Sequence, residues 1–322
     1  MFYNTGIATY IWILSNQKSV HRRGKVQLID ATEWYGKLRK NLGSKNCELR
    51  GEDIERITEE FMDFDEYIAK KQRMIELLKE QKTVIINQAV TKGLNSDVPM
   101  KYSGIEWLGE IPEHWQVKRL GWITSEINDI NHEMPKAVIS GVAFLSAKDL
   151  LDNGTLNFTK DIKFISEEDF ERLSKKVRPQ KDDIVYSRIG AKLGKSRLVK
   201  VNTRFLVSYS CCIIRVKKNI SMPEFINIIL DSDFVFTEAK LRTVGVGVPD
   251  LGLREISRFP IPFPPLNEQK EIALFIEKKS EKINRAIATI EKEIKLIQEY
   301  RTTLISETVT GKIDVRKYRP PH

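Results

Sequence analysis

The sequence predicts an α+β protein in which one mixed α/β domain is flanked by two long helices. Three observations predict it: a helical pattern that occurs twice, a middle region rich in aromatic and turn residues at 101 to 264, and a short N-terminal segment with strand-like runs. The 322 residues are 41% hydrophobic, so the chain is long enough to bury a sizeable core and is not a disordered tail.

The first 64 residues contain two strand-like runs, at 8 to 14 and at 25 to 29, followed by a polar stretch that we predict to be helical from Glu52. The apolar run at 7 to 14 has no basic flank before it and is far shorter than the roughly 20 residues of a membrane-spanning helix. We therefore predict a buried strand, a soluble chain and a cytoplasmic location.

The cysteines agree with that location. Cys47, Cys211 and Cys212 are too few and too badly spaced for a disulfide framework or a paired zinc site, because adjacent cysteines seldom satisfy disulfide geometry. They indicate a reducing compartment.

One helical pattern occurs twice. A shift of 219 residues superimposes residues 68 to 91 on residues 287 to 310, and nine of these 24 positions are then identical. The isoleucines of the second copy alternate between steps of four and three, as at the a and d positions of a coiled coil, and the first copy keeps the same phase. The predicted helix-pairing residues are Ile68, Ile75, Leu78, Ile85, Ile283, Ile287, Ile290, Ile294 and Ile297.

So narrow an apolar seam needs another helix. We predict helices over residues 66 to 92 and 266 to 309 that pair with each other, within one chain or between two. An ordinary amphipathic helix on a globular core is the alternative, but it does not explain why the pattern occurs twice in one phase.

The region from 101 to 264 has a different character. Short β-rich runs at 183 to 186 and 205 to 216, together with aromatic and turn residues, predict an α/β domain. Residues 259 to 265 (FPIPFPP) cannot form a helix or a central strand, because proline lacks the backbone N–H. We predict a stiff extended connector into the second long helix, with a proline-rich ligand for a partner domain as the alternative.

The net charge of +9 suggests an anionic partner such as nucleic acid. The charge is concentrated: residues 172 to 218 hold 14 basic and two acidic residues, whereas residues 101 to 171 hold seven and 13, and residues 219 to 264 hold four and six. Such a cluster is a natural track for phosphates, and arginine forks can also read guanine edges. A solvated surface is the alternative interpretation.

Within this segment, residues 186 to 195 (YSRIGAKLGK) place two glycines and several polar side chains on an expected strand and turn, where the backbone can approach a ligand closely. We predict DNA contacts from Arg188, Lys192, Lys195 and Arg197, with Tyr186 and Ser187 as polar neighbours. Phosphate contacts, which position a protein without specifying sequence, are predicted for Arg178, Lys181, Lys200 and Arg204.

Catalytic patterns are scarce. The four histidines include no pair at metal-ligand spacing, and no Gly-x-Ser-x-Gly elbow, Walker loop or Gly-x-Gly-x-x-Gly occurs. Glu293 and Lys295 resemble half of a nuclease Glu-x-Lys signature but lie in the middle of a predicted helix, where an exposed pair is expected. We predict a binding protein with no catalytic residue and no metal site.

Together the motifs resemble a known family. The order of helix, residues 101 to 115 (KYSGIEWLGEIPEHW), α/β domain, residues 264 to 269 (PPLNEQ), long helix and residues 308 to 311 (TVTG) is similar to the specificity (S) subunit of type I restriction-modification enzymes. Residues 183 to 190 (DIVYSRIG) and the two repeats add to this resemblance, which covers residues 65 to 318. In that family two recognition domains each read half of a split DNA site, and an antiparallel coiled coil separates them and docks methyltransferase subunits.

The chain departs from that pattern, because it has both helices but one recognition domain. In place of the first domain, residues 2 to 16 and 24 to 31 resemble a strand pair of the type I methyltransferase (M) subunit, without that subunit's S-adenosylmethionine loop or Asn-Pro-Pro-Tyr-type motif. We hypothesise that recombination or deletion joined an M fragment to the C-terminal half of an S subunit near residues 60 to 66.

The resemblance implies four parts: an M-like fragment at 1 to 64, a first spacer helix at 65 to 100, a DNA target recognition domain at 101 to 264, and a second long helix with a tail at 265 to 322. It implies a non-catalytic subunit that binds double-stranded DNA and M and restriction (R) subunits, with S-adenosylmethionine, ATP and Mg in those partners only. A homodimer through the helices would restore two recognition domains. The alternative is a rearranged remnant that docks M subunits or dimerises without specifying a DNA target.

Overall fold

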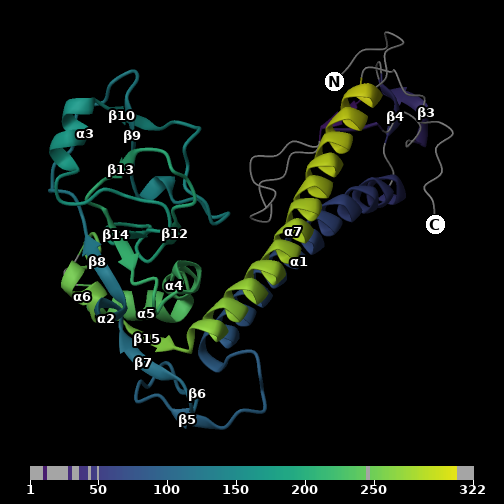
Figure 1. Cartoon of the computed structure of the whole chain (residues 1–322). Helices are drawn as coiled ribbons and strands as arrows, with labels where there is room; N and C mark the ends of the chain where they lie inside the picture. The colour runs from purple at the N-terminus through teal and green to yellow at the C-terminus, as the bar shows by residue number, and fades with distance from the viewer. Residues whose placement is uncertain are drawn as a thin grey trace. The chain divides into compact units, whose positions relative to one another are not determined.

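The structure is a computed structural model of the whole chain (Figure 1). It describes the backbone of residues 10–12, 28–30, 36–42, 45–48, 51–243 and 247–309, and the side chains of residues 64–243 and 247–303. The chain forms two compact units, one of Met1–Leu78 with Ile283–His322 and one of Lys79–Lys282. The predicted fold class is confirmed, since a mixed α/β region lies between two long helices.

The first unit contains two small antiparallel strand pairs. Strand β1 (Tyr10–Trp12) pairs with β2 (Leu28–Asp30), and β3 (Gly36–Leu42) pairs with β4 (Lys45–Glu48). Strands β1 and β2 overlap the two runs predicted to be strands, and the other residues of those runs lie outside the described ones.

The two long helices are α1 (Gly51–Lys92) and α7 (Leu266–Val309), and each contributes residues to both units. In the first unit Ile68, Ile75, Ile290 and Ile294 form one buried cluster, with Leu78, Ile287 and Ile297 partly buried against it. Ion pairs of Asp65 with Arg301 (3.1 Å) and of Lys71 with Glu293 (2.7 Å) flank this cluster. The helices therefore run antiparallel, because residue numbers rise along one as they fall along the other.

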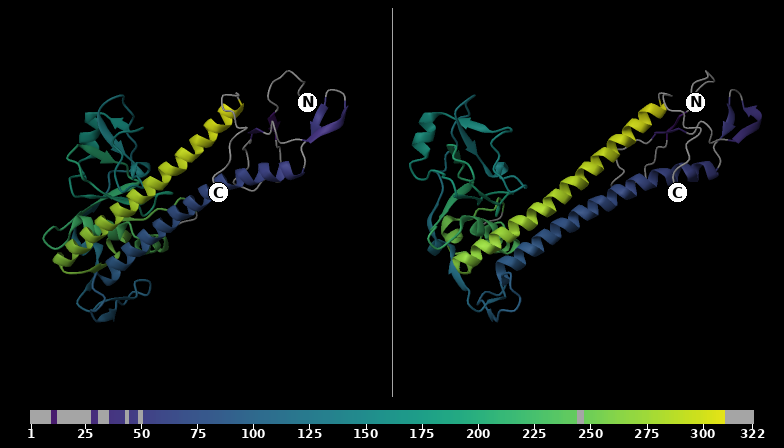
Figure 2. Two further views of the ribbon diagram at one scale, coloured as in Figure 1. Left: turned by 90° about the vertical axis from the view of Figure 1, so that its right-hand side faces the viewer. Right: turned by 45° about the vertical axis from the view of Figure 1, so that its right-hand side comes forward.

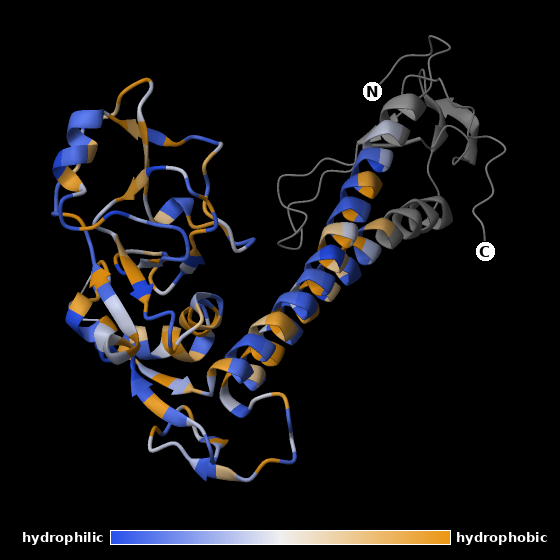
Figure 3. Ribbon diagram, viewed as in Figure 1, coloured by the Kyte–Doolittle hydropathy of each residue, from blue (hydrophilic) through white to orange (hydrophobic). Residues whose placement is uncertain are grey.

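Both views in Figure 2 show these parts of α1 and α7 side by side. Along the coloured part of each helix apolar residues alternate with hydrophilic ones (Figure 3), as expected of a surface helix with one apolar stripe. Of the other predicted helix-pairing residues, Ile283 is buried and Ile85 is half-buried. None of the described helices combines the length and apolarity needed to cross a membrane.

The second unit is organised around a four-stranded antiparallel sheet with the order β12-β11-β14-β8. A three-stranded sheet has the order β10-β9-β13, and two-stranded ribbons are formed by β15 with β7 and by β5 with β6. The bounds of these strands are β5 Met100–Tyr102, β6 Glu110–Pro112, β7 Gln116–Arg119, β8 Thr124–Asn128, β9 Val142–Leu145, β10 Lys163–Ile165, β11 Ile184–Ser187, β12 Ser196–Leu198, β13 Phe205–Val207, β14 Cys211–Val216 and β15 Pro260–Phe263. The shorter helices are α2 Leu120–Ile123, η2 Ala147–Asp149, α3 Glu167–Leu173, α4 Pro223–Leu230, α5 Asp233–Arg242 and α6 Leu253–Ser257.

The four-stranded sheet separates two hydrophobic cores. Alternate residues of a strand point to opposite faces, so Ile184 and Ile214 belong to one core while Val185 and Ile213 belong to the other. All four residues of β11 are buried, because both faces of this strand are covered.

The run at 205 to 216, predicted as one β-rich stretch, forms two strands in different sheets. Strand β13 pairs in parallel with β9, and β14 pairs with β11 and β8. A turn separates them, in which the backbone N–H of Cys211 donates to the carbonyl of Ser208 at 2.9 Å.

The proline-rich connector is extended, as predicted. It forms β15 and pairs with β7 in a two-stranded ribbon, where Pro260 is opposite Arg119 and Pro262 is opposite Val117. A ribbon of two strands tolerates these prolines because each strand has a free edge on which no N–H is needed.

Two sequence motifs attach the start of α7 to the second unit. Glu268 accepts hydrogen bonds from the ring nitrogens of His114 (2.8 Å) and Trp115 (2.9 Å), so the end of the motif at 101 to 115 meets the motif at 264 to 269. The next residue, Gln269, is fully buried; its Oε1 accepts from the N–H of Met222, and its Nε2 donates to the carbonyl of Pro264. These contacts fix where the long helix leaves the domain.

Candidate nucleic-acid interface

Most of the basic residues between 172 and 218 are neutralised in the folded domain. Ten of the 14 lie within 4.0 Å of a carboxylate. The pairs are Arg172 with Glu133 and Asp169, Lys176 with Asp129, Arg178 with Glu171, Arg188 with Asp129 and Asp250, Lys192 and Lys195 with Asp152, Arg197 with Asp231, Arg204 with Glu167, Arg215 with Glu126 and Asp183, and Lys218 with Asp182. The acidic stretches beside the segment supply most of these partners, so its surplus of positive charge is largely cancelled in space.

Four of the predicted DNA-contacting residues are buried. Tyr186 and Ser187 are 0% exposed, Arg188 is 4% exposed and Arg197 is 2% exposed. Burial also raises the pKa of Tyr186 well above its usual value. In this conformation these side chains have no surface with which to touch DNA.

The other six predicted residues reach solvent. Arg178, Lys181, Lys200 and Arg204 are exposed, and Lys192 and Lys195 are partly exposed on the turn between β11 and β12. Lys195 bonds Asp152 at 2.9 Å and holds the pKa of that carboxyl below its usual range.

The backbone conformation of this turn requires its two glycines. Gly190 and Gly194 have φ of +89° and +85°, a conformation that residues with a side chain rarely adopt. A Cβ at Gly194 would also lie 2.6 Å from the ring of Phe236. Protein packing therefore requires Gly194, where the sequence suggested close approach of a ligand.

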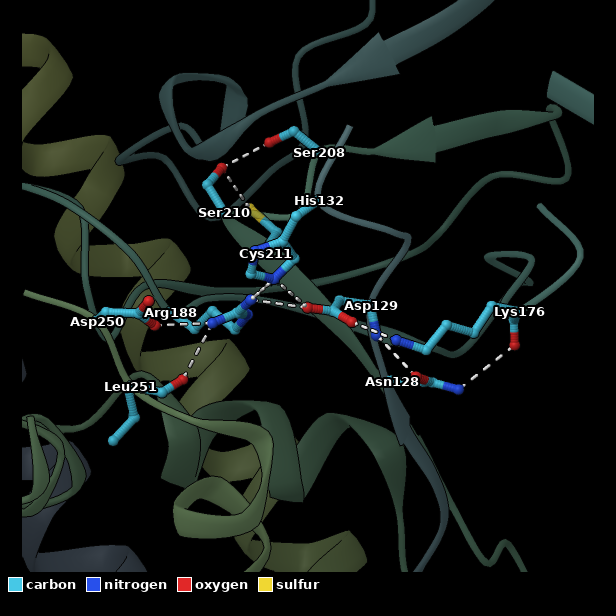
Figure 4. A network of polar contacts seen from close by, with 10 residues as sticks. All are labelled: Asn128, Asp129, His132, Lys176, Arg188, Ser208, Ser210, Cys211, Asp250 and Leu251. Carbon is cyan, nitrogen blue, oxygen red and sulfur yellow. Dashed lines mark hydrogen bonds and ion pairs between the residues drawn. The ribbon is translucent and has the colours of Figure 1, made fainter. Parts of the chain in front are cut away.

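Arg188 forms the centre of a polar network at the end of β11 (Figure 4). Its Nη2 donates to Asp129 Oδ2 at 2.7 Å, and its Nη1 donates to Asp250 Oδ1 at 2.8 Å and to the carbonyl of Leu251 at 3.4 Å. Lys176 donates to the second oxygen of Asp129 at 2.8 Å. An arginine is always charged, so its burial requires such partners.

The exposed ring of His132 completes the network. Its Nε2 lies 2.9 Å from Arg188 Nη2, and the ring stacks on Tyr209 with 4.8 Å between centroids. The hydroxyl of Ser210 contacts Ser208 at 2.6 Å, and the carbonyl of Ser210 accepts from the backbone N–H of Arg188 at 2.9 Å.

The network joins three connections of the domain. Asp129 begins the connection from β8 to β9, Arg188 begins the turn after β11, and Asp250 precedes α6. We call this edge of the sheet the loop end, defined by Asp129, Arg188 and Asp250. Its connections present exposed apolar side chains: Met134 is 57% exposed and Val248 is 71% exposed. Such a surface can contact the methyl groups of thymine in a major groove.

The sequence patterns assign no role to the carboxylates of the loop end or to the residues that anchor α7. Asp129 and Asp250 could have been suspected from the charge balance, because an acidic excess beside a basic segment favours pairing between them. Nothing in the local sequence marks His132. Among the described residues no group of three or more His, Cys, Asp or Glu side chains could hold a metal ion.

Comparison with known proteins defines the class. Residues 112–296 match the family described as the type I restriction modification DNA specificity domain, and this match covers more than half of the chain. The chain belongs to this family.

Individual relatives are more distant. The chain is 25% identical over 281 residues to the putative type I restriction enzyme MjaX specificity subunit of Methanocaldococcus jannaschii, covering 82% of this chain and 58% of that protein. It is 24% identical over 268 residues to the MjaVIII specificity subunit of the same organism, covering 82% of this chain and 61% of that protein. The chain thus spans about three-fifths of the length of these curated relatives.

A solved structure has the same fold. It comes from work on complex assembly and conformational transition of the type I R-M system, and it aligns with a TM-score of 0.53 at 14% identity, covering 83% of this chain and 62% of that chain.

The N-terminal part has a different relationship. Residues 1–98 match the family described as N-6 DNA Methylase, as expected of a methyltransferase-like fragment. The match extends beyond the predicted boundary at residue 64 into α1, which is continuous over Gly51–Lys92.

Proposed function

We propose that this chain is a DNA-recognition subunit of a type I restriction-modification complex in the cytoplasm, and that residues 101 to 264 bind one half-site of double-stranded DNA. The observation that carries the proposal is the family match over residues 112–296, which includes the whole of the loop end. In this proposal the chain performs no chemical step. Partner M and R subunits supply methylation and cleavage and bind S-adenosylmethionine, ATP and Mg.

Arg188 acts here as a positioning residue. Its two carboxylate partners belong to different connections of the domain, so the guanidinium holds both in one arrangement. The side chains that read base edges then come from the exposed parts of these connections, such as Met134 and Lys136. Arginine suits this role because its fork can bond two carboxylates at once.

The helix pair acts as a spacer and as the docking surface for M subunits. Support comes from the buried isoleucine cluster between α1 and α7. Because these seam residues already contact each other within one chain, a homodimer through the same seam would have to exchange helices. Replacing Ile287, Ile290 and Ile294 with Asp should abolish capture of M subunits while the domain at 101 to 264 stays folded; retained capture would contradict the role.

Binding of the full chain to labelled duplexes, with M subunit supplied, tests the proposal. Affinity should fall by orders of magnitude between about 50 and 200 mM salt if six or more phosphates are neutralised. Absent or salt-independent binding would reject it.

A second candidate is a rearranged remnant that docks M subunits without specifying a DNA target, and the match of residues 1–98 to N-6 DNA Methylase supports the M-like fragment from which this candidate starts. Methylation sequencing of the host separates the two. Loss of a methylated motif on deleting this gene supports recognition, and an unchanged methylome supports the remnant.

A further inference from the structure

The opposite end of the four-stranded sheet carries a second group of basic residues. Beside the end of β12 lies Lys200, before β11 lies Lys181, and after β14 comes Lys217. The start of β8 adds α2 with Trp122, and Arg119 precedes α2 on β7. We call Lys181, Lys200, Lys217, Arg119 and Trp122 the lysine row.

Backbone and side-chain contacts link neighbouring members of the lysine row. The N–H of Asp182 donates to the carbonyl of Val199 at 2.9 Å, which brings the segments of Lys181 and Lys200 together. The ion pair of Lys218 with Asp182 (2.7 Å) connects these segments to the end of β14.

Contacts of the same kind connect Lys217, Trp122 and Arg119 at the other side of the row. Lys217 donates from its backbone N–H to Ile123 and from its Nζ to the carbonyl of Trp122, both at 2.9 Å. The guanidinium of Arg119 lies 5.7 Å from the centre of the Trp122 ring. At about 4.8 Å between strands, four adjacent strand ends extend over roughly 14 Å.

The charge of the lysine row is not cancelled. Lys181, Lys200, Lys217 and Arg119 are exposed, and none forms an ion pair with a carboxylate of the described residues. Asp182, which follows Lys181 in the chain, is already paired with Lys218. At the loop end, by contrast, Arg188 and Lys176 are both paired.

We propose that the lysine row binds the phosphates of a DNA duplex, an inference that rests on the proposed function and assigns the contacts that position the domain. Lysine is a compact, strongly hydrated charge that suits phosphate without reading a base. Neutralising phosphates releases counterions, and several adjacent unpaired cations do this best. Trp122 is a positioning residue, because its ring holds the Arg119 guanidinium at the end of the row.

An acidic protein surface fits the row less well. Protein interfaces have a desolvated apolar centre and are depleted in lysine. The row offers Trp122 as its one large exposed apolar side chain among the described residues, and its other four members are cations.

The test compares two triple variants of the full chain in duplex binding measured by fluorescence anisotropy against salt concentration. One variant is Lys181→Gln/Lys200→Gln/Lys217→Gln, in the row. The matched control is Arg172→Gln/Arg242→Gln/Arg258→Gln, which removes the same charge from ion-paired residues for which no DNA contact is predicted. Circular dichroism verifies that both variants are folded.

The row variant should have a slope of log affinity against log salt that is smaller by about 2.7 than that of the wild type, because three phosphate contacts are lost. When the salt concentration rises from about 50 to 200 mM, the affinity of the row variant should therefore fall by a factor roughly 40 times smaller than that of the wild type. The control variant should keep most of the wild-type slope. Equal slopes in the two variants, or an unchanged slope in the row variant, would overturn the inference.

Failure of the proposed function and failure of the phosphate assignment give different results. If the wild type binds no duplex, the proposed function fails. If the wild type binds and the row variant keeps its slope but no longer captures M subunit, the row is a protein-docking surface and the phosphate assignment is wrong.

Discussion

The two ends of one four-stranded sheet use positive charge in opposite ways. At the loop end Arg188 is buried and bonded to two carboxylates, whereas at the other end the lysines of the row are exposed and lack carboxylate partners among the described residues. Both groups come largely from the same basic segment of the sequence. The number of basic residues in a segment therefore does not measure the charge that a partner meets.

Arginine and lysine are divided between the buried and the exposed positions in the same way. The three least exposed cations of the basic segment are arginines: Arg188 and Arg197 are buried, and Arg215 is 27% exposed with two carboxylate partners. Asp183 raises the pKa of Arg215 further by hydrogen bonding. A guanidinium has five donors in a fixed fork and satisfies several acceptors at once, which an ammonium on a flexible stem does less well.

The largest effect is expected from breaking the loop end. Arg188→Met leaves Asp129 buried with one of its two cations removed, and should lower the free energy of unfolding by about 3–5 kcal/mol. Urea denaturation followed by circular dichroism measures it. Lys181→Met, at the exposed row, is the control and should change stability by no more than about 0.5 kcal/mol. Similar losses in the two variants would contradict the difference between the ends.

A second effect concerns β14, which connects the two ends. Burial raises the pKa of the Cys211 thiol to about 12, whereas an unfolded thiol has a pKa of about 8.5. Between these values the unfolded state releases a proton that the folded state keeps. Stability should therefore be complete below about pH 8.5 and fall as the pH rises toward 12, by at most about 1.4 kcal/mol per pH unit for this group.

Denaturation at a series of pH values measures this dependence. Cys211→Ala should make it shallower, because the titrating thiol is removed. An unchanged pH dependence in this variant would show that Cys211 does not titrate in this way.

Single substitutions in the row should have a smaller effect. Each of Lys181→Gln, Lys200→Gln and Lys217→Gln should reduce the salt slope of duplex binding by about 0.9, equivalent to roughly 3.5-fold between about 50 and 200 mM salt. Lys195→Gln is the matched substitution at an ion-paired lysine and should reduce it less. A larger reduction for Lys195→Gln would reverse the assignment of the two ends.

The smallest effect is expected from Trp122. Replacing it with Ala removes the ring under Arg119, an exposed cation–π contact of about 0.5–1 kcal/mol. Trp122→Phe keeps an aromatic ring and should retain most of the contact. Anisotropy titrations should therefore rank duplex affinity as wild type, then Phe, then Ala, and equal affinities would remove Trp122 from the row.

The long helices and the extended proline-rich segment could be predicted because their patterns are local. A step of three or four residues places isoleucines on one face of a helix. Proline disfavours the interior of a helix because it lacks the backbone N–H. The class of the protein could be predicted too, since motifs such as residues 264 to 269 keep their order along the chain.

The site could be predicted only in part. The basic segment predicts phosphate contacts for Lys181 and Lys200, but it does not connect Lys217, Trp122 and Arg119 with them, because these residues come from separate elements. The same limit applies to Arg188, whose partners Asp129 and Asp250 are 59 and 62 residues away.

Local patterns are enough to predict the two helices, the mixed α/β region between them and the basic character of one segment. Which cations of that segment stay exposed without a carboxylate partner among the described residues, and which are buried against carboxylates, depends on the folded arrangement. Helix and strand patterns depend on neighbours in the chain, whereas ion pairing and desolvation depend on neighbours in space. A count of charges can therefore indicate an anionic partner. Only the pairing of the strands shows which cations are buried and hold loops together, and which are exposed and able to bind a phosphate.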